Sequence, residues 1–305
     1  MPQFTIIIPC HNAVETIETT LNAVRAQSVT EWEAICVDDG STDATARILD
    51  QAALADDRFR VLRIANRGPS VARNLGAALA KGEVLCYCDA DDYWEATKLA
   101  QLQCAFADPD VDGVFAKVAF FASAGQAKTY SSVPKSALTL PMLMGENPVC
   151  CMSNLSIRRG LFTSLGGLSD GFVHNEDLEW LLRLVGNGAN IVGLDSLQVW
   201  YRTSRGGLSA DLSKMAMSRK KALQVAMGFG CPPTRENEAV YLRYLARRAL
   251  RLDNGGATAL RFVLRGIGLA PRAFLMPPRR GAATALAALF APILPLPMRR
   301  ALFAR

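Results

Sequence analysis

Several features that define other nucleotide-using enzymes are missing from this sequence. The turn after the first apolar run reads Pro9-Cys10-His11-Asn12-Ala13, so it lacks the Gly-x-Gly-x-x-Gly pattern of a dinucleotide oxidoreductase. The same turn is neither glycine-rich nor basic, as the triphosphate-holding loop of a nucleotidyltransferase would be. Cys86-Tyr87-Cys88 has no second Cys/His pair at zinc-site spacing. These absences argue against both enzyme classes and against a structural zinc cluster.

Export signals are missing as well. The chain enters an apolar run directly, with no basic stretch before it and no small-residue cleavage site, so we expect no secretion signal. Four of the eight cysteines lie in or beside apolar runs, where a reduced thiol behaves as a small hydrophobe: Cys10, Cys36, Cys86 and Cys88. We therefore expect a cytoplasmic protein. The formal charge of +6 suits an anionic ligand or an anionic membrane surface, and it does not indicate nucleic acid.

The length and the apolar content allow a large folded domain. The chain has 305 residues, of which 50% are hydrophobic, enough for one α/β domain and a smaller appendage. Short apolar runs alternate with helical patterns, which predicts a largely parallel sheet with helices on both faces. The expected strands cover 4–9, 33–38, 60–64, 83–88 and 113–121, and the expected helices between and after them cover 13–27, 43–55, 69–81 and 96–107.

Unusual polar residues collect where these strands end. His11 and Asn12 follow the first strand, the run 38–41 follows the second, and the run 89–92 follows the fourth. Ligands of such sheets bind at the carboxyl ends of the strands. Asp89 and Asp91 follow a buried strand, and burying two carboxylates together is unfavourable unless a cation or hydrogen-bond donors compensate. A diphosphate-bound Mg²⁺ or Mn²⁺ is one interpretation. The other is a turn in which Asp91 or Asp92 caps the next helix.

The polar motifs together resemble a known family. Their order and spacing are similar to those of the family 2 glycosyltransferases, an inverting group with the GT-A fold, over about residues 3 to 210. The motifs are Ile6 to Asn12, Val37 to Asp43, Arg73 to Gly76, Asp89 to Asp92 and the pair Glu176-Asp177. The resemblance implies a Rossmann-like α/β domain that transfers a sugar from a nucleotide-sugar donor.

The resemblance implies donor-side roles for matching residues. Pro9 and Asn12 would shape the nucleotide-binding turn, and Asp39 would hydrogen-bond the base. Arg73 would lie near the base or the diphosphate, and Asp89 would also contact the nucleotide. The alternatives are a turn in which Ser41 or Thr42 only caps a helix, and a solvated charge at position 73.

The resemblance also implies a metal, an acceptor side and a lid. Asp91, with Asp89, would bind Mn²⁺ or Mg²⁺. In the pair Glu176-Asp177, Asp177 would be the base that takes the acceptor's proton, with Glu176 as the second candidate, although acidic residues at a helix start are also common dipole partners. The acceptor side would include His174 and Trp180, and Arg202 or Arg205 would stabilise the leaving group from a segment that folds over the diphosphate.

The C-terminal third differs in composition. We expect a catalytic domain over 1–206 and a basic, helical extension over 207–305. Within the extension, the helical pattern 236–252 places Arg243, Arg247 and Arg251 opposite an apolar face, which indicates either a solvated face or a membrane contact. The apolar run 281–298 is uncharged and holds three prolines, which argue against a straight spanning helix and favour a segment lying in the interface of an anionic membrane.

The resemblance implies a direct displacement with inversion. Two functions of the chain are compatible with the sequence. In the first, it moves a sugar, UDP-sugar being the commonest donor of the family, to a hydroxyl of a glycan or glycolipid in cell-surface polysaccharide or glycolipid synthesis. In the second, it is an inactive scaffold that binds a nucleotide sugar or a lipid. A missing metal aspartate or a missing base would mark the scaffold, and the sequence retains both Asp91 and Asp177.

Overall fold

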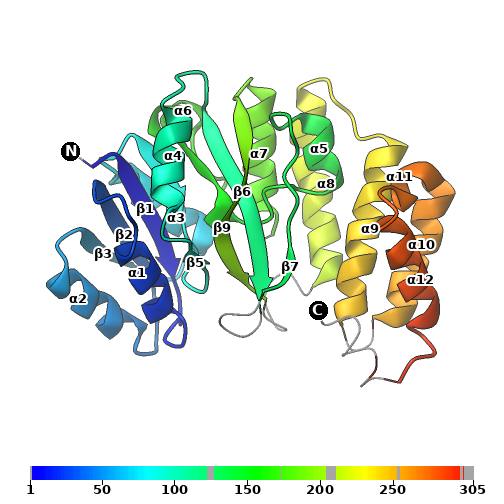
Figure 1. Ribbon diagram of the computed structural model, residues 1–305, viewed down its shortest axis with the longest axis horizontal. Coiled ribbons are helices and arrows are strands. Elements are labelled where there is room, and N and C mark those ends of the chain that lie inside the picture. Colours follow the sequence, from blue (N-terminus) through cyan, green and yellow to red (C-terminus); the bar gives the residue numbers. More distant parts are fainter. Residues whose placement is uncertain are drawn as a thin grey trace. The chain divides into compact units, whose positions relative to one another are not determined.

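The computed structural model describes residues 2–121, 127–172, 174–203, 211–252, 255–295 and 298. The chain divides into two compact units, the first formed by Met1–Leu138 with Pro148–Thr203 and the second by Thr139–Asn147 with Ser204–Arg305 (Figure 1). The segment Thr139–Asn147 therefore belongs with the C-terminal helices. The predicted boundary at 206 and 207 lies within 204–210, outside the described residues.

The first unit is built on a mixed sheet. Its strands are β1 (Phe4–Cys10), β2 (Trp32–Asp39), β3 (Phe59–Ile64), β4 (Val84–Tyr87), β5 (Tyr93–Trp94), β6 (Gly113–Phe121), β7 (Ala127–Tyr130), β8 (Ser156–Arg158) and β9 (Ile191–Arg202). They follow the order β3-β2-β1-β4-β8-β6-β9-β5, with β7 paired to β6. β1 to β4 are mutually parallel, as expected, whereas β8 runs antiparallel to both β4 and β6. The second half is thus less parallel than the sequence pattern predicted.

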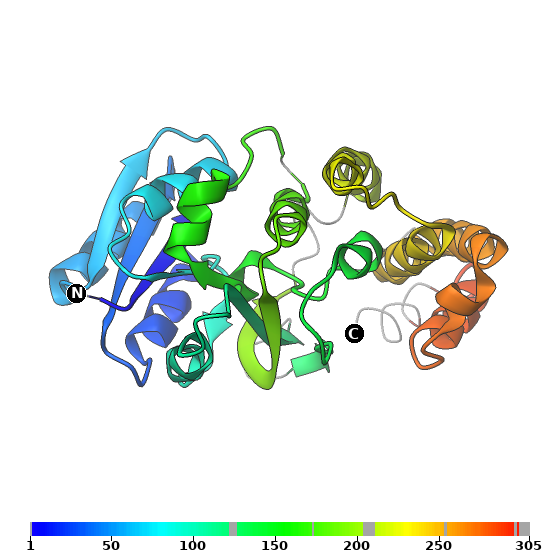
Figure 2. The ribbon, with the colours of Figure 1, turned by 90° about the horizontal axis from the view of Figure 1, so that it is seen from above.

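Helices cover both faces of this sheet. Because side chains on both faces are buried, the central strands are apolar at nearly every position. The helices are α1 (Ile17–Arg25), α2 (Thr45–Ala55), α3 (Pro69–Ala78), α4 (Lys98–Phe106), α6 (Arg159–Leu165) and α7 (Glu176–Gly186). Ile6 and Ile8 of β1 share one apolar core with α1, α2 and α4. The opposite face of the sheet packs on α3 and α7, and Figure 2 shows helices on both sides. Gly76 allows α3 to approach, because a Cβ there would lie 2.6 Å from Ile7.

The topology brings four chain segments to one edge of the sheet. β1, β2 and β4 are parallel, so the turns that follow Cys10, Asp39 and Tyr87 leave the same edge. β9 runs parallel to β6, which shares the direction of β4 because β8 is antiparallel to both, so Arg202 ends at that edge too. β9 is a single long strand of 12 residues. This edge holds the candidate site.

The second unit is helical. It contains α5 (Leu140–Gly145), α8 (Leu212–Gly228), α9 (Arg235–Arg251), α10 (Gly256–Leu269), α11 (Pro271–Leu275) and α12 (Gly281–Phe290). α9 begins at a capping box, in which the Thr234 side chain accepts from the Asn237 N–H and the Asn237 side chain accepts in return. The apolar face of α9 packs against α10, α11 and α12 around Phe274. Within the described residues, no helix is both long and apolar enough to cross a membrane.

The arginines of α9 correct the sequence interpretation. Arg243 is buried, and its guanidinium donates to the carbonyl oxygens of Ala273, Phe274 and Met276 at the end of α11. Glu146 pairs with Arg243 at 3.5 Å and with Arg247 at 3.1 Å. These two side chains therefore hold the second unit together internally. Arg243 forms neither a solvated face nor a membrane contact, whereas Arg247 is partly exposed and Arg251 is exposed, so the prediction is corrected for Arg243 alone.

Candidate active site

The first turn of the site is bonded to the loop after β2. Asn12 has a left-handed backbone (φ 47°), and its Oδ1 accepts from the Thr42 N–H at 2.8 Å. The Asn12 N–H donates to Ser41 Oγ at 3.1 Å. The residue before α2, Ala44, is its N-cap, and no side chain caps the helix. The alternative in which Ser41 or Thr42 only caps a helix is therefore wrong. The two loops form one surface beside Pro9, the β1 residue that precedes the turn.

Asp39 fixes the loop that leads into α3. Its carboxylate is buried, and the two oxygens accept from the backbone N–H groups of Arg67 at 2.7 Å and Gly68 at 2.8 Å. Gly68 has φ +90°, a conformation that favours glycine. The Asp39 carbonyl oxygen lies 2.8 Å from His11 Nδ1. Asp39 thus sets the start of α3, and with it the position of the arginine one turn further on.

Arg73 connects the two carboxylate groups of the site. It is buried on α3, and its guanidinium donates to Asp89 Oδ1 at 2.5 Å and to Glu176 Oε1 at 3.3 Å. Burial opposes the charge, but the carboxylates of Asp89 and Glu176 raise the pKa of Arg73 above its ordinary value. The solvated-charge alternative for this residue is therefore wrong. The bridge places the strand-end aspartates next to the start of α7.

The loop after β4 is hydrogen-bonded to a serine that the sequence pattern did not single out. Ser153 lies in the short 3₁₀ helix η1 (Met152–Asn154), where its Oγ accepts from the Asp89 N–H at 2.9 Å and donates to Asp92 at 2.5 Å. The other Asp92 oxygen accepts from the Arg202 N–H at 2.9 Å. α4 begins after Thr97 without a side-chain cap, so Asp91 and Asp92 do not cap it. Asp92 instead ties the aspartate loop to the end of β9.

Asp91 is a partly buried carboxylate next to a like charge. Burial raises the pKa of its carboxyl to about 6, and the charge of Asp89 acts in the same direction. Arg202 Nε donates to the Asp91 carbonyl oxygen at 3.0 Å, and its guanidinium lies 4.8 Å from the centre of the Phe121 ring. In the described part of the chain no three His, Cys, Asp or Glu side chains are grouped as a metal site. Two carboxylates still suit Mg²⁺ or Mn²⁺ when a diphosphate and waters complete the shell.

A buried lysine lies beneath this loop. Lys98 Nζ is 3.4 Å from the Ser153 carbonyl oxygen and 4.7 Å from the centre of the Trp94 ring. Burial lowers its pKa to about 8, although the neighbouring cysteines Cys86 and Cys88 act in the other direction. Neither Lys98 nor Ser153 had a sequence signal, because each meets its partners only through tertiary packing.

The pair at the start of α7 completes the site. Asn175, with φ 56°, precedes the helix and turns the chain so that Glu176 and Asp177 open it. Burial raises the pKa of Asp177 to about 7; the Glu176 charge adds to this, and Arg73 opposes it. An aspartate with a pKa near neutrality is poised to accept a proton near neutral pH. Its environment therefore fits a general base.

Three further predicted site residues have different outcomes. Trp180 is fully buried, and its ring packs edge-on against Tyr87 and Phe162. A ring without exposed surface does not line an acceptor site, so that prediction is corrected to a core role. His174 is partly buried just before α7. Arg205 lies outside the described residues.

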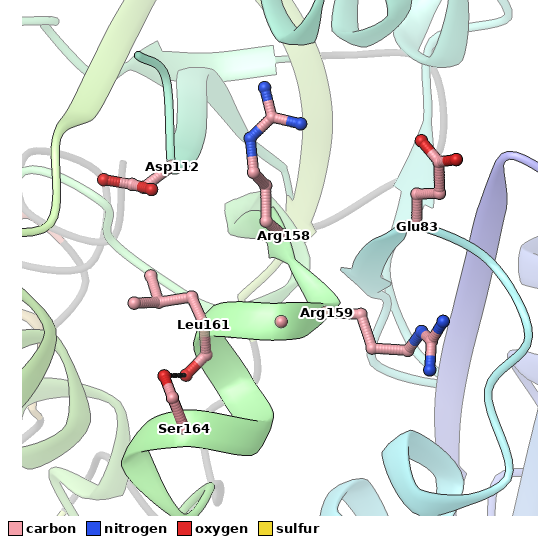
Figure 3. A pocket seen from close by; sticks show the side chains of 7 residues that line it. Glu83, Asp112, Arg158, Arg159, Leu161 and Ser164 are labelled. Carbon is pink, nitrogen blue, oxygen red and sulfur yellow. Dashed lines mark hydrogen bonds between the residues drawn. The ribbon is translucent and has the colours of Figure 1, made fainter. Parts of the chain in front are cut away.

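A separate pocket lies at the other end of β4. Its volume is about 440 Å³, and Figure 3 shows its lining, which includes Glu83, Asp112, Arg158 and Arg159. The two guanidinium groups point in different directions. Their Nε atoms donate to the carbonyl oxygens of Val111 and Gly82, respectively. The pocket contains none of the predicted site residues, and its arginines do not converge on one ligand.

The match to known proteins agrees with the geometry. The model for "Glycosyl transferase family 2" matches residues 5–166, and the chain belongs to this family. TuaG of Bacillus subtilis, a glycosyltransferase named for teichuronic acid biosynthesis, is 34% identical over 188 residues, which are 56% of this chain and 74% of TuaG. WfaP of Escherichia coli, a UDP-Glc:alpha-D-GlcNAc-diphosphoundecaprenol beta-1,3-glucosyltransferase, is 25% identical over 229 residues, 73% of this chain and 86% of WfaP. Three further glycosyltransferases match over 30% to 44% of their own length.

Solved structures support the fold. S. aureus TarS 1-349 in complex with UDP superposes with a TM-score of 0.59 at 18% identity, covering 94% of this chain and 89% of that one. The mannosyltransferase PcManGT from Pyrobaculum calidifontis, in complex with GDP-Man and Mn²⁺, gives a TM-score of 0.60 at 20% identity, covering 96% and 86%. The predicted α/β fold of the GT-A type and the assignment as a glycosyltransferase are thereby confirmed.

Proposed function

We propose that this glycosyltransferase moves a sugar from a UDP-sugar to an acceptor hydroxyl with inversion, using Asp177 as the base. The observation that carries the proposal is the Arg73 bridge, with contacts of 2.5 Å to Asp89 and 3.3 Å to Glu176. It joins a strand-end carboxylate pair, suited to a divalent cation that would neutralise a diphosphate, to a helix start whose aspartate has a pKa of about 7. The buried guanidinium of Arg73 thus joins the proposed donor side to the proposed acceptor side.

On the donor side, the loops after β1 and β2 would receive the nucleotide. Pro9, Asn12 and Asp39 shape this surface through the bonds between the two loops and the start of α3. Asp89 and Asp91 would hold a Mn²⁺ or Mg²⁺ ion, which supplies positive charge beside the diphosphate oxygens. Arg202 would add a second positive group at the same edge, and Arg205 would follow it in the chain.

On the acceptor side, Asp177 takes the proton of the attacking hydroxyl. The acceptor oxygen forms a bond to the anomeric carbon while the bond from that carbon to the diphosphate oxygen breaks. The electron pair of the broken bond leaves with the nucleoside diphosphate. Because attack comes from the face opposite the leaving group, the anomeric configuration inverts. His174, just before α7, would line the acceptor side.

For the acceptor, we propose a lipid-linked glycan made on the cytoplasmic side of a membrane. WfaP is named for a diphosphoundecaprenol-linked acceptor, and TuaG for a cell-surface polymer. Cys10, Cys36, Cys86, Cys88 and Cys151 are buried without a disulfide, which suits a reducing compartment. In this proposal, catalysis belongs to residues 1–206, and residues 207–305 bring the enzyme to its acceptor.

The test replaces Asp177 by Asn, which keeps the size of the side chain and removes its basicity. We expect turnover to fall by about 10² to 10⁴, the usual contribution of a positioned general base. UDP affinity, measured by calorimetry, should change little because the donor-side carboxylates are intact. UDP-glucose with the acceptor named for WfaP is the first substrate pair to use.

Glu176→Gln is the matched control, since it removes the neighbouring charge and leaves Asp177 in place. Near-normal transfer by the Asp177 variant would reject this residue as the base. A selective loss of transfer in the Glu176 variant would move the role to Glu176. Absence of transfer and of nucleotide binding in the unaltered protein, across a panel of nucleotide sugars, would favour the scaffold instead.

A further inference from the structure

α12 is folded with its large apolar side chains on the outside. Its buried face consists of small residues: Gly281, Thr284, Ala288 and, just beyond the helix, Ala291. Its exposed face carries large ones, with exposed fractions of 59% for Leu286, 55% for Leu289, 51% for Phe290 and 77% for Ile293. An ordinary surface helix of a globular protein does the reverse. Packing among the described residues of the second unit therefore does not account for these side chains.

The exposed residues form one stripe. Their spacing of three, one and three residues places them on a single side of a helix that turns 100° per residue. Ile293 continues the stripe beyond the helix, since its N–H donates to the Phe290 carbonyl oxygen at 3.1 Å. On the neighbouring elements, Leu264 of α10 and Met276 after α11 are also exposed, at 65% and 53%. We call Leu286, Leu289, Phe290 and Ile293 the α12 stripe.

The charge around the α12 stripe has one sign. Residues 255–295 contain no aspartate and no glutamate. They contain five arginines, which are Arg261, Arg265, Arg272, Arg279 and Arg280. The first four of these are exposed, whereas Arg280 is partly buried and lies 3.5 Å from Glu146. Arg265 lies 3.8 Å from Glu238, so Arg261, Arg272 and Arg279 are the exposed arginines for which the structure shows no carboxylate within ion-pair distance among the described residues. An apolar stripe whose border carries an excess of cations fits a partner that is apolar inside and anionic at its surface.

We propose that the α12 stripe inserts into the interfacial region of an anionic lipid bilayer, with the arginines of α10, α11 and the start of α12 on the lipid headgroups. Basic and apolar helix faces bind membranes through both kinds of contact. A second copy of this chain fits less well, because a two-fold contact through the stripe brings the same arginines together. For the nature of the acceptor, the inference rests on the proposed function; the membrane contact itself does not depend on transfer.

The experiment measures sedimentation of the full chain with vesicles, which needs no transfer activity. Vesicles of phosphatidylglycerol and phosphatidylcholine in equal amounts are compared with vesicles of phosphatidylcholine alone. We expect binding to the anionic vesicles, and a decrease as salt rises because the arginine contribution is screened. The triple variant Leu286→Gln, Leu289→Gln, Ile293→Gln should bind the anionic vesicles at least about tenfold more weakly, since it removes most of the inserted apolar area.

The matched control is Leu54→Gln, which alters another exposed leucine, 89% exposed on α2 of the first unit. It should bind vesicles like the unaltered protein. Both sets of substitutions affect exposed side chains, so the melting temperatures should stay close to that of the unaltered protein. UDP binding by the triple variant should also be unchanged, which separates this inference from the proposed chemistry.

Three outcomes would overturn the inference. The first is an unaltered protein that does not sediment with anionic vesicles at low salt. The second is a triple variant that binds them as well as the unaltered protein does. The third is a dimer, detected by light scattering, that the triple substitution dissociates, because the stripe would then be an interface between copies of this chain.

Discussion

The strand-end site of the first unit and the α12 stripe of the second unit differ in which kind of side chain they bury. The site draws charged groups inward: Asp91 and Asp177 are partly buried near like charges, and Arg73 is buried between Asp89 and Glu176. The stripe instead exposes large apolar side chains and buries small ones. Each placement is unfavourable for a protein that only has to fold. Each placement therefore motivates one of the two proposals, a cation with its diphosphate in the first unit and a bilayer in the second.

The largest expected effect tests the site side of this comparison. Asp91→Ala removes one of the two carboxylates proposed to hold the cation, and we expect Mn²⁺-dependent turnover to fall by about 10³, the equivalent of several kcal/mol of charge stabilisation. Calorimetry should show that Mn²⁺ no longer strengthens UDP binding. Asp195→Ala, which alters an exposed carboxylate on β9, serves as the control. Unchanged metal-dependent UDP affinity in the Asp91 variant would contradict the metal assignment.

A second prediction concerns how the charge of Asp177 lowers the free energy of unfolding. The pKa of Asp177 is raised from 3.8 to about 7 in the folded state, so its stabilising contribution is present below pH 4 and is lost as the pH rises through about 7. At pH 8, without ligands, Asp177→Asn should therefore unfold with a free energy about 2 kcal/mol higher than that of the unaltered protein. At pH 4 the two proteins should be equal. Denaturant titrations at both pH values measure this difference, and an Asn variant that is no more stable at pH 8 would show that the charge is well solvated.

The smallest expected effect separates the site from the core beside it. Trp180→Phe should lower the free energy of unfolding by about 1 kcal/mol, because a smaller ring leaves space against Tyr87 and Phe162. The apparent affinity for the acceptor should stay the same, since Trp180 has no exposed surface. Steady-state kinetics at varied acceptor concentration provides the check. A selective rise in the acceptor KM would return this residue to the acceptor side.

Much of the first half of the fold could be predicted from local pattern. The expected strand 113–121 coincides with β6, and the first three expected strands fall within one residue of β1, β2 and β3 at each end. The expected strand 83–88 also falls within one residue of β4 at each end, whereas β8 and η1 were harder, because short segments gain their structure from neighbours far away in the chain. Asp92 illustrates the limit: its sequence neighbours indicate a helix cap, yet its partners are Ser153 and Arg202.

The sequence by itself determined the parallel half of the sheet, the collection of carboxylates at its edge and the family, since these depend on local periodicity and on motifs that stay together. Only the tertiary structure decided which polar residues contact each other and which side chains are buried. It placed Arg73 between Asp89 and Glu176 and sent Trp180 into the core. It also turned Arg243 of α9 inward and Leu286 and Leu289 of α12 outward. The physical reason is that composition sets how much charge and apolar surface a segment carries, whereas burial depends on which distant segment packs against it.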